Sequence, residues 1–201
     1  MKYEFIAIDL QNDFTTEGGG HYKHRPAVAF LKEHIFPYFK EHNVKVNEII
    51  SDYRAPRPGD KDKSCVPGTY GYESIVPREI VKSQWIKCMN SPLWTRDNAG
   101  VASGKPGLPR QDVTGFTKWL EESVGNRDEV TPVLFGLTAD CCVMSTAQEL
   151  NWRGYYPLVI KEGVEHYSGN PSDTESVLKS PFSNWAKVIT WDELKGKLEA
   201  H

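Results

Sequence analysis

The sequence predicts an α/β fold, specifically a three-layer α/β/α sandwich with a central parallel sheet. Short apolar runs alternate along the chain with segments of helical periodicity, as parallel strands joined by crossover helices do. The chain has 201 residues, of which 39% are hydrophobic, and this is enough for one domain with a substantial core. Neither an internal repeat nor a second domain is indicated, so we expect a single domain over residues 1–201.

Three strand-like runs and one amphipathic helix occupy the first part of the chain. Apolar residues recur at helical spacing over residues 26–42, and Pro37 should kink or divide this helix. A long loop rich in Pro and Gly, residues 54–79, separates the second strand from the third, and loops of this length are usually functional or mobile. The predicted strands are Lys2–Ile8, residues 46–52 and residues 83–88.

A second long loop, residues 91–110, opens the rest of the chain. A helix over residues 114–124 follows, and either Asp112 or Thr114 is suited to cap it. Strands then alternate with helices, which is the pattern of a parallel sheet covered on both faces. The predicted strands are residues 130–136, 157–161 and 185–190, and the predicted helices are residues 142–153 and a C-terminal helix beginning at Asp192.

Composition and charge argue against several classes of function. The formal net charge is −3 and the 24 Lys and Arg residues are scattered, so nucleic acid is not an expected partner. No apolar stretch approaches the ~20 residues of a membrane span, and the N-terminus lacks the apolar length of a signal peptide. We therefore expect a cytoplasmic protein that acts on a small molecule and has no membrane partner.

The four cysteines fit neither a disulfide framework nor a zinc site. Two of them are neighbours in the sequence, which makes them poor disulfide partners, and the set lacks metal-ligand spacing. Reduced thiols in a reducing compartment fit this pattern best. The cysteines are Cys65, Cys88, Cys141 and Cys142.

The most informative segment combines a buried strand, a tight turn and a helix that begins with a thiol. The apolar run Val133–Leu137 indicates the strand, and Cys142 falls in the first turn of the helix that follows. The peptide dipoles at a helix N-terminus favour the thiolate, which is the form that attacks a carbonyl carbon. The alternative is a buried cysteine that serves as a small apolar residue.

Two further polar residues stand where predicted strands end. Asp9 follows the first strand and Lys87 ends the third, and open α/β folds place their sites at this edge of the sheet. Each residue also has an ordinary structural interpretation. Asp9 is a suitable cap for the next turn, and Lys87 is a suitable solvated residue at a strand end.

Three blocks of sequence, which include these residues, resemble the isochorismatase-like cysteine hydrolases, a family that includes nicotinamidases and N-carbamoyl amidases. Asp9-x-Gln11-x-Asp13-Phe14 is similar to the opening motif of the family, and Lys87-x-x-x-Ser91 is similar to its lysine motif, with Leu93 replacing an aromatic residue. Residues 136–147 resemble its cysteine motif, with Ala139 at a threonine position. The match places the nucleophile of the family on Cys142 and not on Cys141.

The resemblance implies a catalytic triad of Asp9, Lys87 and Cys142. Cys142 would attack an amide carbonyl, Lys87 would favour its thiolate, and Asp9 would carry the thiol proton to the leaving nitrogen. Water would then hydrolyse the resulting thioester. The resemblance also implies a cis peptide bond at Leu137–Thr138 and an oxyanion hole formed by the backbone N–H groups of Thr138 and Cys142.

The motifs and the family resemblance also indicate substrate contacts and an assembly state. Phe14 directly follows Asp13 within the opening motif, and we expect it to line the pocket together with Trp94. Loops 54–79 and 91–110 are expected to close that pocket. Relatives commonly form dimers or tetramers, so the resemblance implies a homo-oligomer.

The metal motif of nicotinamidases, Asp-x-His, is not matched. The corresponding stretch reads Asp52-Tyr53-Arg54, and Ser64 stands where nicotinamidases often have histidine. None of the six histidines lies between residues 43 and 165, and a carboxylate without imidazole is a poor zinc or iron site. We therefore expect no metal and no cofactor, with Asp52 and Arg54 forming a salt bridge or binding a polar group of the substrate.

The predicted function is metal-independent cleavage of a C–N bond in a small amide or carbamoyl compound. Two alternatives stay open. One is hydrolysis of a vinyl ether, as in isochorismatases, some of which lack the cysteine because the reaction needs an acid and no nucleophile. The other is a non-catalytic family member that binds a small ligand, since a fold does not fix a function.

Overall fold

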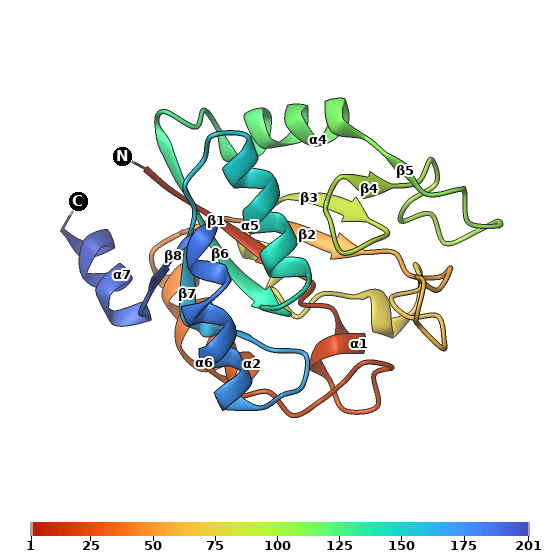
Figure 1. Cartoon of the computed structure of the whole chain (residues 1–201), viewed down its shortest axis with the longest axis horizontal. Coiled ribbons are helices and arrows are strands. Elements are labelled where there is room, and N and C mark those ends of the chain that lie inside the picture. Colours follow the sequence, from red (N-terminus) through yellow and green to blue (C-terminus); the bar gives the residue numbers. More distant parts are fainter. Residues whose placement is uncertain (1, 201) are drawn as a thin grey trace.

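The structure, a computed structural model, describes residues 2–200 and is built around a six-stranded sheet (Figure 1). All of its strands are parallel, and their order across the sheet is β3-β2-β1-β6-β7-β8. The strands are β1 (Lys2–Ile8), β2 (Val46–Ser51), β3 (Val81–Lys87), β6 (Val130–Leu137), β7 (Leu158–Glu165) and β8 (Lys187–Ile189). The predicted α/β fold with a central parallel sheet is therefore confirmed.

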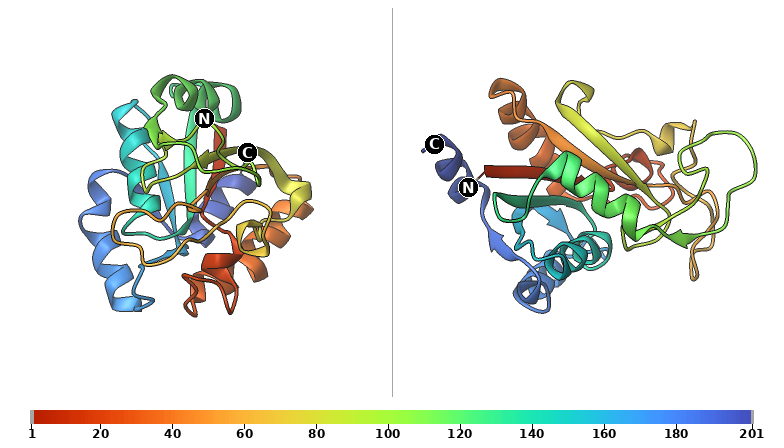
Figure 2. Two further views of the ribbon diagram at one scale, coloured as in Figure 1. Left: turned by 90° about the vertical axis from the view of Figure 1, so that its right-hand side faces the viewer. Right: turned by 90° about the horizontal axis from the view of Figure 1, so that it is seen from above.

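Helices cover both faces of the sheet and complete three layers (Figure 2). Side chains of β1 alternate between two cores, since Phe5 and Ala7 belong to one and Ile6 and Ile8 to the other. The first core is closed by α2 (Pro26–Phe30), α3 (Phe36–Glu41) and α7 (Trp191–Glu199), and the second by α4 (Val113–Trp119), α5 (Cys142–Trp152) and α6 (Pro171–Lys179).

The helix predicted over residues 26–42 is divided, as the proline indicated. A π-helical turn, Leu31–Ile35, separates α2 from α3, and Pro37 lies in the first turn of α3. Proline has no N–H to donate to the preceding turn, and it is tolerated where a helical segment begins.

Several element boundaries differ from the sequence prediction. Strand β7 continues to Glu165, β3 starts at Val81, and α7 starts at Trp191 because Thr190 and Glu193 form a capping box. Asp112, not Thr114, caps α4 by accepting a hydrogen bond from Gly115 N at 2.9 Å. The elements that the sequence did not predict include α1 (Asn12–Thr15), α6, and the two-residue strands β4 (Trp94–Thr95) and β5 (Arg110–Gln111), which pair with each other.

The reversal of strand order places a candidate site between β1 and β6. From β1 the chain continues to β2 and β3 on one side of the sheet, and from β6 it continues to β7 and β8 on the other side. A crevice therefore opens at the carboxyl ends of β1 and β6. Loops 54–79 and 91–110 gather at this end, opposite the two termini (Figure 1). None of the helices within residues 2–200 is long and apolar enough to cross a membrane.

One glycine allows β6 to lie close to β1 at this edge. Gly136 has a φ of +124°, and a Cβ atom there would lie 2.1 Å from the carbonyl oxygen of Ile8. Any side chain would therefore push apart the two strands that carry the site.

Candidate active site

The structure brings Asp9, Lys87 and Cys142 together at the carboxyl end of the sheet. Lys87 Nζ lies 2.8 Å from Asp9 Oδ2 and 3.4 Å from Cys142 Sγ. All three residues are almost inaccessible, with exposed fractions of 1% for Asp9, 0% for Lys87 and 5% for Cys142. Three polar groups that are distant in sequence therefore form one buried cluster.

Lys87 reaches this cluster from a strand that is not next to β1. The three residues do not come from adjacent strands, because β2 lies between β3 and β1. The side chain of Lys87 crosses the end of β2, where the last residue of the strand is Ser51. Ser51 Oγ lies 2.7 Å from Lys87 Nζ, so a small hydroxyl both leaves room for the lysine and accepts a hydrogen bond from it.

The buried lysine is held as a cation. Burial alone lowers the pKa of Lys87, but the Asp9 carboxylate, together with Cys142 and Tyr53, raises it well above the ordinary lysine value. The ammonium group has partners on several sides, including the Tyr53 hydroxyl at 2.7 Å. Lys87 therefore supplies a fixed positive charge next to the sulfur.

The surroundings of Cys142 favour the protonated thiol over the thiolate. Burial and the Asp9 carboxylate raise the pKa of Cys142 to about 12, although Lys87 lowers it. The helix N-terminus and the lysine, which the sequence indicates, both favour thiolate. The loss of solvent around the buried sulfur raises the pKa and outweighs them. The Asp9 carboxylate, which raises this pKa partly through a hydrogen bond with the thiol, is the candidate acceptor for its proton.

Asp9 adopts an uncommon backbone conformation at the end of β1. Its φ is +50°, in the left-handed region that residues other than glycine seldom occupy. Its Oδ1 accepts a hydrogen bond from Ser51 Oγ at 2.7 Å, and its backbone N–H donates to Ile49 O at 2.9 Å. These contacts with β2 fix the carboxylate beside the ammonium group of Lys87.

The other polar residues of the first motif hold loops in place. Gln11 is fully buried, donates to the carbonyl groups of Ser51 and Tyr72, and accepts a hydrogen bond from Ser51 N at 2.7 Å. Asp13 Oδ2 accepts a hydrogen bond from Cys65 N at 2.5 Å. Gln11 and Asp13 therefore attach the loop of residues 54–79 to the end of β1.

The turn between β6 and α5 carries the two amides predicted for an oxyanion hole. The peptide bond between Leu137 and Thr138 is cis, at the position that the family resemblance implies. Thr138 O accepts hydrogen bonds from the N–H groups of Cys141 and Val143, both at 3.1 Å. The N–H of Cys142, in the first turn of α5, has no acceptor within the helix.

A cavity of about 600 Å³ opens beside the cluster and has a mixed polar and aromatic lining. Trp94, one of the two predicted substrate contacts, lines it. Phe14, the other, lies behind the wall, where its ring stacks on His21 at 5.6 Å between centroids and meets Tyr53 edge-on. The lining residues are His21, Arg57, Pro58, Asp60, Met89, Asn90, Ser91, Trp94, Cys141, Ser145 and Tyr167.

Asn90 joins the cavity to the buried cluster. Its Oδ1 lies 3.7 Å from Cys142 Sγ and 2.5 Å from Arg57 Nη1. Arg57 in turn stacks over the Tyr53 ring at 4.0 Å and pairs with Asp60 at 2.8 Å. The sequence argument did not single out Asn90, Arg57 or Tyr53, although Asn90 lies within the lysine motif.

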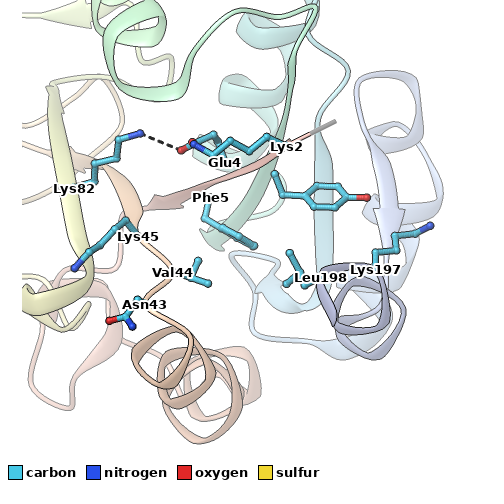
Figure 3. Close-up of a pocket in the computed structure, with 10 residues that line it drawn as sticks. Lys2, Glu4, Phe5, Asn43, Val44, Lys45, Lys82, Lys197 and Leu198 are labelled. Atoms are coloured by element: carbon cyan, nitrogen blue, oxygen red, sulfur yellow. Dashed lines mark hydrogen bonds and ion pairs between the residues drawn. The ribbon is translucent and has the colours of Figure 1, made fainter. Parts of the chain in front are cut away.

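A second cavity lies at the opposite, amino-terminal edge of the sheet (Figure 3). Its lining is mainly basic, with four lysines around one carboxylate, and Glu4 pairs with Lys2 at 2.5 Å and with Lys82 at 3.2 Å. Neither a cysteine nor any predicted site residue is among the described residues that line it. The chemistry suggested by the sequence therefore belongs to the carboxyl edge.

Asp52 and Arg54, which follow β2, form a buried salt bridge of 3.0 Å. The guanidinium group also donates to the backbone carbonyls of Asn98 and Val101, and Gly100 N donates to Asp52 Oδ2 at 3.0 Å. Of the two roles expected for this pair, the salt bridge is the one observed. It ties the loop of residues 91–110 to the end of β2.

This position does not fit a metal ion. Arg54 places a permanent positive charge against the Asp52 carboxylate, where a metal would have to replace it. Over residues 2–200, no group of three or more His, Cys, Asp or Glu side chains is arranged to hold a metal.

Comparisons with solved structures identify the fold. An isochorismatase-like hydrolase from Alkaliphilus metalliredigens aligns with a TM-score of 0.68 and 20% identity, over 97% of this chain and 95% of its own. A nicotinamidase/pyrazinamidase from Bacillus subtilis gives 0.64 and 20%, over 94% and 100% of the two chains. An N-carbamoylsarcosine amidase from Thermoplasma acidophilum gives 0.58 and 19%, over 94% and 96%.

Comparisons at the level of sequence are negative. No protein-family model matches the chain, and no curated protein matches it. The similarity therefore lies in the three-dimensional arrangement, at sequence identities near 20%. The chain has the fold of the isochorismatase-like hydrolases.

Proposed function

We propose that this protein is a cysteine hydrolase that cleaves the C–N bond of a small amide or carbamoyl compound through a thioester, without a metal. The contact of Cys142 Sγ with Lys87 Nζ at 3.4 Å, beside the Asp9 carboxylate, is the observation that carries this proposal. A nucleophile, a fixed cation and a proton acceptor are the groups that amide cleavage requires.

The first half of the reaction acylates Cys142. As Sγ attacks the amide carbonyl carbon, Asp9 accepts the thiol proton, so that the thiolate forms only when a substrate is present. The proton then passes from Asp9 to the leaving nitrogen, the C–N bond breaks, and ammonia or an amine departs. Lys87 stabilises the negative charge that develops on sulfur and on Asp9.

Hydrolysis of the thioester completes the cycle. Asp9, again a carboxylate, removes a proton from water as the water oxygen attacks the acyl carbon, and the proton then returns to the sulfur of Cys142. In both halves a negative charge develops on the carbonyl oxygen. The N–H groups of Thr138 and Cys142 are assigned to stabilise it, because they lie in the turn that presents the sulfur.

The cavity supports a small substrate. A volume of about 600 Å³ lies within the usual range for small-molecule sites. Trp94 offers an aromatic surface, while Asn90 and Arg57 offer polar contacts close to the sulfur. The substrates named for structural neighbours, nicotinamide and N-carbamoylsarcosine, set the size of compound to test first.

The vinyl-ether alternative is less well supported. That reaction needs a proton donor and no nucleophile, so it gives no reason for Cys142 to contact Lys87 beside the Asp9 carboxylate. A purely ligand-binding role is disfavoured for a related reason. A buried ammonium–carboxylate pair is costly to desolvate, and a site without chemistry has no need of one against a thiol.

A screen of small amides and carbamoyl compounds for ammonia release tests the proposal. For any compound that is turned over, acid quenching during the steady state followed by peptide mass mapping should place the acyl group on Cys142. Release of a pyruvate-type product from a vinyl ether, with no ammonia from any amide, would favour the isochorismatase-type reaction instead.

A further inference from the structure

Tyr53 is a fully buried residue that touches the reacting sulfur and has no role in the triad. It follows β2, and its hydroxyl oxygen lies 2.7 Å from Lys87 Nζ, 3.7 Å from Cys142 Sγ and 3.2 Å from Met89 O. Its ring contacts the Arg57 guanidinium on one face, and its exposed fraction is 0%. The hydroxyl therefore sits among a cation, a carbonyl and the nucleophile.

The three N–H bonds of Lys87 limit which neighbouring groups can accept a hydrogen bond from it. An ammonium group has three N–H bonds and no acceptor, but four acceptors surround Lys87 Nζ. Asp9 Oδ2 takes one proton at 2.8 Å. Ser51 Oγ takes the second at 2.7 Å, because its own proton goes to Asp9 Oδ1, also at 2.7 Å.

The third proton of Lys87 goes to Tyr53. At 2.7 Å the two atoms are hydrogen-bonded, and since Nζ accepts nothing, the hydroxyl oxygen of Tyr53 must be the acceptor. The sulfur, at 3.4 Å, therefore feels the charge of Lys87 but receives none of its three protons. The O–H of Tyr53 is left with two acceptors, Met89 O and Cys142 Sγ.

We propose that Tyr53 is a further catalytic residue, whose O–H donates a hydrogen bond to the sulfur of Cys142 when the thiol proton moves to Asp9. In the resting site the O–H points to Met89 O, and rotation about one C–O bond redirects it to the thiolate. No bond to the phenolic proton breaks. When the thioester forms, the sulfur becomes a poor acceptor and the O–H returns to the carbonyl.

The chemistry of the site favours this role. Burial raises the pKa of Tyr53 well above its ordinary value, so the phenol stays protonated as a donor across the working pH range. Lys87 polarises the hydroxyl by donating to it, which strengthens the hydrogen bond that the hydroxyl gives. Tyr53 thereby links the cation to the sulfur through a donated hydrogen bond.

The test compares Tyr53→Phe with a matched control, Tyr155→Phe. Tyr155 is also a buried tyrosine whose hydroxyl donates to a carbonyl, Gly125 O at 2.7 Å, but it lies away from the site. Both variants are made in a Cys141→Ala background, so that the peptide that carries Cys142 holds one thiol. The rate of iodoacetamide modification of that peptide is measured from pH 7 to pH 10.

Tyr53→Phe should slow alkylation by at least about tenfold at each pH and shift the profile upward by about one pH unit, as loss of a hydrogen bond to a charged group does. Tyr155→Phe should match the parent. For a substrate found by the ammonia screen, Tyr53→Phe should lower kcat while KM changes little. An unchanged alkylation profile in Tyr53→Phe, whatever happens to turnover, overturns the inference.

This inference rests on the proposed function only for its kinetic consequence. If alkylation slows in Tyr53→Phe but no amide substrate needs Cys142, the hydrogen bond to sulfur stands and the proposed hydrolysis fails. If Cys142 proves to be the nucleophile and alkylation does not respond to the substitution, the hydrolysis stands and the role of Tyr53 fails.

Discussion

Lys87 Nζ and Cys142 Sγ lie 3.4 Å apart in a region closed to solvent, and yet the thiol is the resting form. The reason is the third member of the cluster. Asp9 neutralises Lys87 and at the same time disfavours a second negative charge beside it, and burial acts in the same direction. The pair is therefore arranged for ionisation that is coupled to proton transfer, and not for a permanent thiolate.

Replacing the cation should make the thiol harder to ionise. Lys87→Met removes the positive charge that lowers the pKa of Cys142, so Cys142 should react with iodoacetamide at pH 8 at least about tenfold more slowly. Lys82→Met is a suitable control, because Lys82 is on the same strand but pairs with Glu4 at the other edge. Equal rates in both variants would show that Lys87 does not affect the nucleophile.

Replacing the carboxylate should have the opposite effect on the thiol. Asp9→Asn removes a negative charge that raises the pKa of Cys142, so alkylation at pH 8 should become faster than in the parent protein. Turnover should nevertheless fall by at least about a hundredfold, because the proton acceptor is gone. Alkylation and ammonia release are measured on one preparation, to check that alkylation rises while turnover falls. A parallel loss of both would argue against proton transfer to Asp9.

The raised pKa of Cys142 should also reduce stability at high pH. An unfolded thiol ionises near its ordinary pKa of 9.0, while the folded thiol stays protonated until about pH 12. Unfolding therefore releases a proton between pH 9 and pH 12. The stabilising contribution of the protonated thiol is complete below pH 9 and is lost as pH rises toward 12. The loss in the free energy of unfolding is up to about 1.4 kcal/mol per pH unit. Urea unfolding at pH 8.5 and pH 10.5 should show a smaller loss for Cys142→Ala than for the parent.

Activity should not depend on a divalent metal. The Asp52–Arg54 salt bridge occupies the position at which the nicotinamidase motif places a metal ligand, and the guanidinium group repels a divalent cation. Turnover measured before and after prolonged chelation, with metal analysis of both samples, should be the same. Activity that disappears on chelation and returns with zinc, iron or manganese would contradict the assignment of this region.

Much of the fold could be predicted because its signals are local. Apolar runs mark β1, β2 and β6, and Pro37 marks the break in the first long helix. The short strands β4 and β5 carry no such signal, since two residues cannot show a period. Their pairing depends on how the loop of residues 91–110 folds back, which is held in part by Arg54 from a different loop.

The candidate site could be predicted only as far as its motifs reach. Asp9 and Cys142 follow strands and Lys87 ends one, and the similarity of the three blocks to family motifs predicted that the three residues meet. The contacts of Ser51 and Tyr53 with the cluster could not be predicted, because they depend on the order of strands across the sheet. That order puts β2 between β3 and β1. The charge state of the thiol also required the burial of the whole cluster, which is a property of the folded chain.

Ammonia release by Cys142→Ala, compared with Cys141→Ala, tests whether Cys142 is the nucleophile. The two thiols are adjacent in sequence, but only Cys142 contacts Lys87, whereas Cys141 faces the cavity beside it. With folding checked by circular dichroism, Cys142→Ala should lose at least about a thousandfold in kcat/KM, and Cys141→Ala should keep most of its activity. Full activity in Cys142→Ala, or its loss in Cys141→Ala alone, would show that Cys142 is not the nucleophile.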